Sequence, residues 1–146
     1  MFYKLIAKVL DGRLQKVMSY IILEAQSGFI PGRRIDDNII LAHELVKSYM
    51  RKYISPGCMI KVDLQKAYDS VEWVYLEQVL EGLAFPDKFI KWVMACVRIV
   101  NYTILLNGEF VEPFNAAKGM RQGDPIFPFL FAIALEYLRR LPHELK

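Results

Sequence analysis

The sequence predicts an α+β domain, and three patterns carry that prediction. Several segments repeat apolar residues at steps of three and four, the spacing of one face of a helix. Residues 58–64 instead alternate apolar and polar side chains, as a strand does, and Asn107-Gly108 lies between two short apolar runs, as in a hairpin. The resulting order is helix, helix, strand, helix, helix, hairpin, loop, helix, with no internal repeat, so we expect helices packed on a small antiparallel sheet.

The first predicted helix covers residues 2 to about 22, with Gly12 as its weak point. A loop follows, QSGFIPGRRIDDN, and two arginines, Arg33 and Arg34, stand at its far end. Arginines can hold phosphates, although exposed arginines usually do no more than favour solubility. The two arginines of this loop therefore either bind phosphate or only favour solubility.

The second predicted helix starts where Asp36 or Asp37 can cap it, and its apolar period continues to residue 53 before Ser-Pro-Gly. The strand at residues 58–64 follows, with one apolar face. Asp69 and Glu72 have the spacing of a capping box, which predicts that the next helix opens there and closes at Gly82.

The last part of the chain contains two more predicted helices. One begins at Pro86 and runs to about Val100. After the hairpin, the polar loop GMRQGDP leads into the final helix, with Asp124 as its cap and Pro125 as its first residue.

Composition indicates an apolar and mildly basic chain. Its 146 residues are 54% hydrophobic and have a mean hydropathy of +0.20, so we expect some apolar faces to be covered by sequence not present here. A net charge of +3 with a pI near 8.8 permits contact with nucleic acid but does not identify a nucleic-acid-binding protein.

Cysteine usage and the termini predict an intracellular, soluble protein. Cys58 and Cys96 have no partners at metal-ligand spacing, so we expect buried free thiols in a reducing compartment. Lys4 and Lys8 interrupt the apolar segment that a signal peptide would need. The longest uncharged apolar run, IFPFLFAIAL, is too short to cross a membrane and contains a proline.

Two carboxylates in the stretch KVDLQKAYDSV are candidate metal ligands. Six residues of strand would separate Asp63 and Asp69 by about 20 Å, and six helical steps would put them on different faces. At most one is therefore a ligand, and Asp63, at the end of the predicted strand, is the better candidate. The alternative is that both are turn or cap residues.

The loop GMRQGDP is a candidate phosphate-binding element. Gly119 and Gly123 let the backbone approach a ligand, Gln122 offers an amide, and Lys118 and Arg121 supply positive charge. The alternative is a solvated loop that leads into a helix.

Three segments together resemble successive motifs of the reverse transcriptases of non-LTR, LINE-type retrotransposons, of the kind abundant in plant genomes. The segments are QSGFIPGR at residues 26–33, KVDLQKAYDSV at 61–71 and GMRQGDPIFP at 119–128. Their order and rough spacing fit as well, and the resemblance covers nearly the whole chain. It implies the fingers (residues 1–57) and part of the palm (residues 58–146) of a right-hand polymerase.

The resemblance implies a role for each matching residue. Asp63 matches the first metal-binding aspartate, and the carbonyl of Leu64 matches a backbone ligand beside it; Mg²⁺ is the implied cofactor. Tyr68 matches the aromatic residue that lies against the sugar of the incoming nucleotide, where its ring would collide with a 2′-hydroxyl and so favour deoxynucleotides. Without the resemblance, Tyr68 would be interpreted as an aromatic residue of the core or of a groove. Gln122 and Gly123 match the loop that lies against the incoming nucleotide and the template base. Arg33 matches the arginine of the fingers that lies near the triphosphate.

The implied function is that of a fragment of an RNA-directed DNA polymerase, which adds deoxynucleoside triphosphates to a DNA primer on an RNA template in the nucleus or cytoplasm. No membrane association is implied, and exposed apolar surface would be covered by the missing palm and thumb. The alternative is a non-catalytic module, derived from a retrotransposon, that binds nucleic acid or a partner.

The sequence departs from the family pattern in two places. No aspartate follows Asp124, so the aromatic-Ala-Asp-Asp box that completes the metal site is absent, and the pair Asp36-Asp37 does not match it. We therefore expect no polymerase activity from this chain alone. Phe127 replaces a small serine, and a ring there could shift the loop and disturb the role of Gln122.

Overall fold

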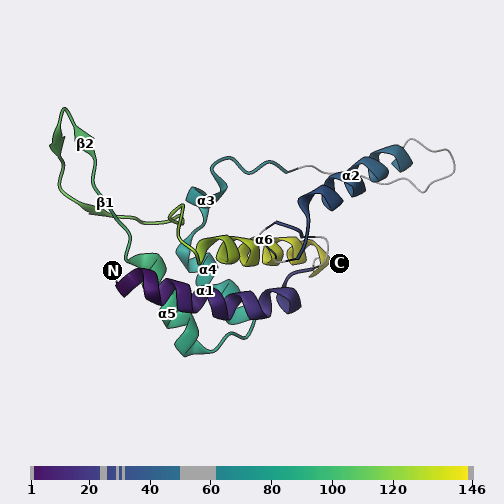
Figure 1. Cartoon of the computed structure of the whole chain (residues 1–146), viewed down its shortest axis with the longest axis horizontal. Helices are drawn as coiled ribbons and strands as arrows, with labels where there is room; N and C mark the ends of the chain where they lie inside the picture. Colours follow the sequence, from purple (N-terminus) through teal and green to yellow (C-terminus); the bar gives the residue numbers. More distant parts are fainter. Residues whose placement is uncertain (1, 24–25, 29, 31, 50–61, 145–146) are drawn as a thin grey trace.

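The computed structural model describes residues 2–23, 26–28, 30, 32–49 and 62–144. Within them it contains six helices and four short strands that pair antiparallel, which confirms the α+β class (Figure 1). Four helices gather around one core, while α2 (Ile35–Tyr49) and the hairpin of β2 (Leu105–Leu106) extend away from them in different directions.

The core is formed by α1 (Phe2–Ile21), α4 (Trp73–Gly82), α5 (Asp87–Arg98) and α6 (Phe127–Glu144). The helix predicted at the amino terminus is confirmed, and its buried stripe faces α5 and α6. Pro86 lies at the N-cap of α5 instead of inside the helix. In the described part of the chain, no helix combines the length and the apolar character that crossing a bilayer requires. The fully buried side chains include Leu14, Met18, Leu76, Val93, Leu130 and Ile133.

The second helix, α2, begins earlier than predicted. Asp36 and Asp37 lie in its first turn instead of capping it, and Asp36 pairs with Arg34 at 2.9 Å. The predicted continuation to residue 53 lies outside the described residues. No residue of α2 is buried, so its apolar side chains are exposed.

The strand predicted at residues 58–64 is not found over residues 62–64. Residues 62–64 are exposed and form no strand, and residues 58–61, with Cys58, lie outside the described residues. A strand needs a neighbour for its backbone hydrogen bonds, and the strands in the described part of the chain pair only with one another. Cys96 is a buried free thiol, as predicted, and burial raises its pKa.

The capping box predicted at Asp69 and Glu72 is wrong. Asp69 lies within a single helical turn, α3 (Ala67–Ser70), and α4 starts only at Trp73, with Glu72 in an extended conformation and without a side-chain cap. The carbonyl of Val71 accepts a hydrogen bond from Gly119 at 2.8 Å. Pairing with a distant loop therefore interrupts the helix where the local sequence would start one.

The strands form two small antiparallel pairs. β1 (Asn101–Tyr102) pairs with β4 (Phe114–Asn115), and β2 pairs with β3 (Glu109–Phe110). The hairpin at Asn107-Gly108 is confirmed, since both residues have positive φ angles, 52° and 89°, as its two-residue turn requires. All four strands are exposed, so the helices pack on one another and not on the sheet.

Candidate functional site

Three of the predicted ligand-binding residues line one cavity. Tyr68, from α3, lies across a hollow of about 220 Å³ from Gln122 and Gly123, in the loop before α6. The rest of the lining comes from the same loop and the start of α6: Arg121, Asp124, Phe127 and Pro128. We refer to this hollow as the Tyr68 pocket.

Backbone hydrogen bonds bring the two walls of the Tyr68 pocket together. The amide of Met120 donates to the carbonyl of Tyr68 at 3.0 Å, beside the bond from Gly119 to Val71. The indole Nε1 of Trp73 donates to the carbonyl of Gly119 at 2.8 Å. Gly119 has a φ of 86°, and a Cβ there would lie 3.1 Å from the Cα of Asp69, so this close approach requires glycine.

The ring of Tyr68 is held by stacking. It lies on Phe131 of α6 with 4.4 Å between the ring centroids and 20° between the planes. Burial also raises the pKa of the Tyr68 hydroxyl. The ring therefore forms a fixed, uncharged wall of the pocket at neutral pH.

A buried carboxylate anchors the far end of the loop. Asp124 is only 8% exposed; it accepts a 2.5 Å hydrogen bond from the hydroxyl of Tyr3 and a 3.3 Å bond from the amide of Ile126. Burial and then this hydrogen bond raise the pKa of Tyr3 far above its ordinary value. The capping role predicted for Asp124 is therefore shifted: α6 starts at Phe127, and Asp124 closes the turn before it.

Sequence reasoning missed Tyr3. No local signal could have found it, because its partner is 121 residues away in the chain. From the sequence, the ring of Phe127 could shift the loop that contains Gln122. In the structure this ring is 1% exposed, packs in the core and lines the Tyr68 pocket together with Gln122.

The structure does not bring Asp63 into the Tyr68 pocket. Asp63 is exposed, and Leu64 lines a separate, apolar cavity with Tyr75 and Phe131. Among the described residues, no three His, Cys, Asp or Glu side chains are grouped so that they could hold a metal ion. One carboxylate does not satisfy the octahedral oxygen coordination that Mg²⁺ prefers, so these residues do not hold Mg²⁺ by themselves.

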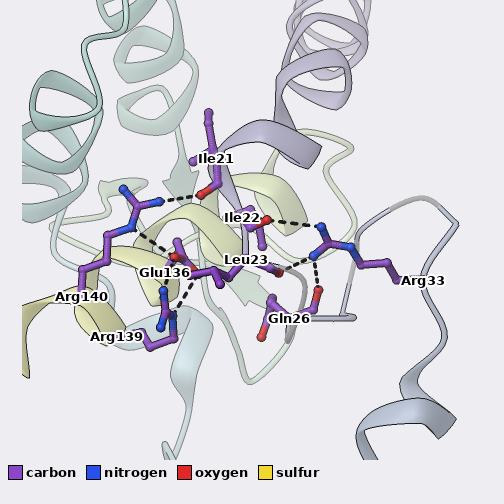
Figure 2. Close-up of polar contacts among 8 residues, drawn as sticks. All are labelled: Ile21, Ile22, Leu23, Gln26, Arg33, Glu136, Arg139 and Arg140. Atoms are coloured by element: carbon purple, nitrogen blue, oxygen red, sulfur yellow. Dashed lines mark hydrogen bonds and ion pairs between the residues drawn. The ribbon is translucent and has the colours of Figure 1, made fainter. Parts of the chain in front are cut away.

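Arg33 lies far from the Tyr68 pocket. Its guanidinium donates to the carbonyls of Ile22 at 3.3 Å, Leu23, and Gln26 at 2.7 Å, just beyond the end of α1 (Figure 2). Tyr3, at the other end of this 20-residue helix, contacts Asp124. A helix of that length spans about 30 Å, so Arg33 and the loop that contains Asp124 contact opposite ends of α1.

Glu136 ties α6 to the same end of α1. Its side chain is 1% exposed and accepts hydrogen bonds from Arg139 at 2.8 Å and Arg140 at 3.1 Å, and Arg140 also donates to the carbonyl of Ile21 at 2.7 Å (Figure 2). Burial raises the pKa of Glu136, but the two arginines outweigh burial and hold it below the ordinary value of 4.5. Arg33 and Arg140 together satisfy carbonyls that the helix end leaves without partners.

We expect Glu136→Gln to change the acid sensitivity of the protein. Because the folded-state pKa of Glu136 is depressed, its contribution is complete above about pH 4.5 and is lost as the pH falls below it. The substitution should lower the free energy of unfolding at pH 7 by about 1 kcal/mol and make it less dependent on pH below 4.5. Urea unfolding at pH 7 and pH 3 measures both effects.

Glu109→Gln is the matched control, because Glu109 lies in the exposed strand β3. It should change the free energy of unfolding by less than about 0.5 kcal/mol. Equal acid sensitivity in wild type and Glu136→Gln would contradict the role given to this carboxylate.

The comparison with known proteins decides the family. A sequence model of the family described as reverse transcriptase (RNA-dependent DNA polymerase) matches residues 1–145. The chain belongs to the reverse transcriptase family. As a family, these enzymes use divalent metal ions and act on a nucleic-acid template and primer.

The similar proteins are named as products of transposable elements. The chain is 30% identical, over 92% of its length, to a Xenopus laevis protein named "Transposon TX1 uncharacterized 149 kDa protein". It is 29% identical, over 82% of its length, to the Drosophila melanogaster Pol polyprotein of the type-2 element R2DM, and 31% identical, over 80%, to that of a type-1 R2 element of Nasonia vitripennis. These matches confirm the predicted non-LTR reverse transcriptase. The chain spans about a tenth of the length of each of these relatives, 10% of the first and 11% of the other two.

Proposed function

We propose that this reverse transcriptase chain forms the nucleotide-facing wall of an RNA-directed DNA polymerase. The observation that carries the proposal is the Tyr68 pocket, in which the residues matched to sugar and base contacts, Tyr68, Gln122 and Gly123, line one hollow. Backbone hydrogen bonds from the loop to α3 fix the distance between them. A pocket built in this way is positioned before a ligand arrives, which lowers the entropic cost of binding.

In this proposal each wall of the pocket has its own task. The ring of Tyr68, stacked on Phe131, stands where it excludes a 2′-hydroxyl and so favours a deoxynucleotide over a ribonucleotide. The side chain of Gln122 and the open backbone at Gly123 contact the nucleotide and the template base from the opposite side. The Arg121 guanidinium, in the same lining, adds positive charge suited to phosphates.

Two further assignments rest on the family. We propose that Asp63, with the carbonyl of Leu64, contributes ligands to a Mg²⁺ site whose other carboxylates come from outside this chain, because the described residues provide no cluster of their own. The triphosphate role of Arg33 stays a prediction, since reaching the pocket would require it to release the three carbonyls that it holds.

Nucleotide binding by the purified chain tests this function. We expect dATP, with Mg²⁺ present, to bind about tenfold more tightly than ATP, which is the discrimination typical of a small steric difference in a pocket. Tyr68→Ala should remove that preference because it removes the wall. Isothermal titration calorimetry with each nucleotide gives the two dissociation constants.

The control is Tyr20→Ala, which removes an exposed tyrosine from α1. It should leave the preference for dATP intact. Equal affinity of the wild type for dATP and ATP would contradict the role of Tyr68. Steeply salt-dependent binding that is indifferent to the nucleotide would favour the non-catalytic module instead.

A further inference from the structure

A second hollow shares the loop that forms the Tyr68 pocket. It has a volume of about 450 Å³, and α1 supplies Lys4 and Lys8 to it while the loop supplies Arg121. Tyr3 and Asp124, which are hydrogen-bonded to each other, also line it. We name it the Lys4 hollow. The loop residues Arg121, Gln122, Gly123 and Asp124 line both cavities.

The charges around the Lys4 hollow are mainly positive. Within the described part of the chain, neither Lys4 nor Arg121 forms an ion pair. Lys8 forms an ion pair with Asp11 at 2.6 Å, but its side chain remains 73% exposed. Asp124 is the one carboxylate among the described lining residues, and the Tyr3 hydroxyl already donates to it. The described first turn of α1 contains no acidic residue, so no carboxylate there offsets the charge of the lysines.

These features suit phosphate groups arranged in a row. Lys4 and Lys8 lie one turn apart, about 6 Å along the axis of α1, and the guanidinium of Arg121 can grip a phosphate with two parallel hydrogen bonds. A cationic groove that follows the backbone is the usual binding element for a single strand. The volume is that of a small-molecule site, so it takes a short stretch of one strand and not a duplex.

We propose that the Lys4 hollow binds the phosphodiester backbone of a single nucleic-acid strand that runs beside the loop of the Tyr68 pocket. The choice of a strand as the ligand rests on the proposed polymerase function, whereas the affinity for phosphate rests on the cations alone. Because the loop is shared, a strand held at Lys4 and Lys8 contacts Gln122 and Gly123, which also line the proposed nucleotide pocket.

The salt dependence of strand binding tests the proposal. Fluorescence anisotropy of a labelled 12-nucleotide oligo(dT) is measured between 50 and 300 mM salt with the wild-type chain and with the double variant Lys4→Gln/Lys8→Gln. Each phosphate contact on a single strand contributes about 0.7 to the slope of log affinity against log salt. Loss of two contacts should therefore reduce the magnitude of the slope by about 1.4.

The matched control is Lys16→Gln/Lys91→Gln. It removes the same charge from exposed positions of α1 and α5 that do not line the Lys4 hollow. A thermal transition of each variant shows that it is folded. The proposal is supported if only the Lys4→Gln/Lys8→Gln slope falls, and it is overturned if both pairs reduce the slope equally, because general charge would then explain binding.

Inorganic tripolyphosphate separates the two sources of phosphate. If it displaces the oligonucleotide only at a total phosphate concentration far above that of the strand, the hollow is a strand site. If it competes at equal phosphate concentration, the hollow takes free phosphate and the proposal falls. Strand binding without selective dATP binding would support this site and refute the function proposed for the Tyr68 pocket. Selective dATP binding without strand binding would support the function of the Tyr68 pocket and refute this site.

Discussion

Asp63→Ala should strongly slow primer extension by a polypeptide that joins this chain to the remaining palm and thumb of a close relative. We expect the rate to fall on the order of 10²–10³-fold, the loss typical when one preorganised group that stabilises charge is removed. Asp63 is the carboxylate that matches the metal-binding position of the family, and it is exposed and free to meet groups from outside the chain. Extension of a labelled DNA primer on an RNA template measures the rate.

Asp69→Ala is the internal control for this prediction. Asp69 is an exposed carboxylate six positions later, inside the single turn α3, so its loss should leave the rate within a fewfold of the starting value. The unfused chain should show no extension with Mg²⁺ or Mn²⁺, because its described residues contain no metal-binding cluster. Full activity of the Asp63→Ala polypeptide would remove Asp63 from the reaction, and extension by the unfused chain would show that the missing carboxylates are not needed.

Phe127→Ala should have the largest effect on stability. The Phe127 side chain is 1% exposed and belongs to the core at the start of α6. Replacing a fully buried phenylalanine with alanine typically costs 3–5 kcal/mol, because transfer energy is lost and a cavity remains. For a chain of this size the midpoint of thermal unfolding should fall by about 6–20 °C. Urea unfolding and thermal melting followed by circular dichroism measure the two quantities.

Phe110→Ala makes the same chemical change at an exposed site. Phe110 is 76% exposed in β3, so its removal should change the free energy of unfolding by less than about 0.5 kcal/mol. Similar losses for Phe110→Ala and Phe127→Ala would mean that the ring of Phe127 does not contribute to the core. The comparison also tests whether the bulky side chain of Phe127 stabilises the fold.

Local patterns in the sequence predicted the elements whose stability is local. The helical period identified α1, α4, α5 and α6 because each buries one apolar stripe in the common core. Asn107-Gly108 predicted the hairpin because the positive φ angles of the turn depend on these two residues alone. The capping box at Asp69 failed because backbone groups near residue 70 pair with Gly119 and Met120 instead.

The sequence by itself determined the family, the α+β class and the grouping of motifs that predicted Tyr68, Gln122 and Gly123. Only the tertiary structure showed that these three line one pocket, that Asp63 stands outside it, and that Arg33 holds the carboxyl end of α1. It alone revealed the bond from Tyr3 to Asp124 and the cations of the Lys4 hollow. The physical reason is that periodicity and turn chemistry act over a few residues, whereas the site depends on contacts between residues 46 to 121 positions apart, which form only when the core packs.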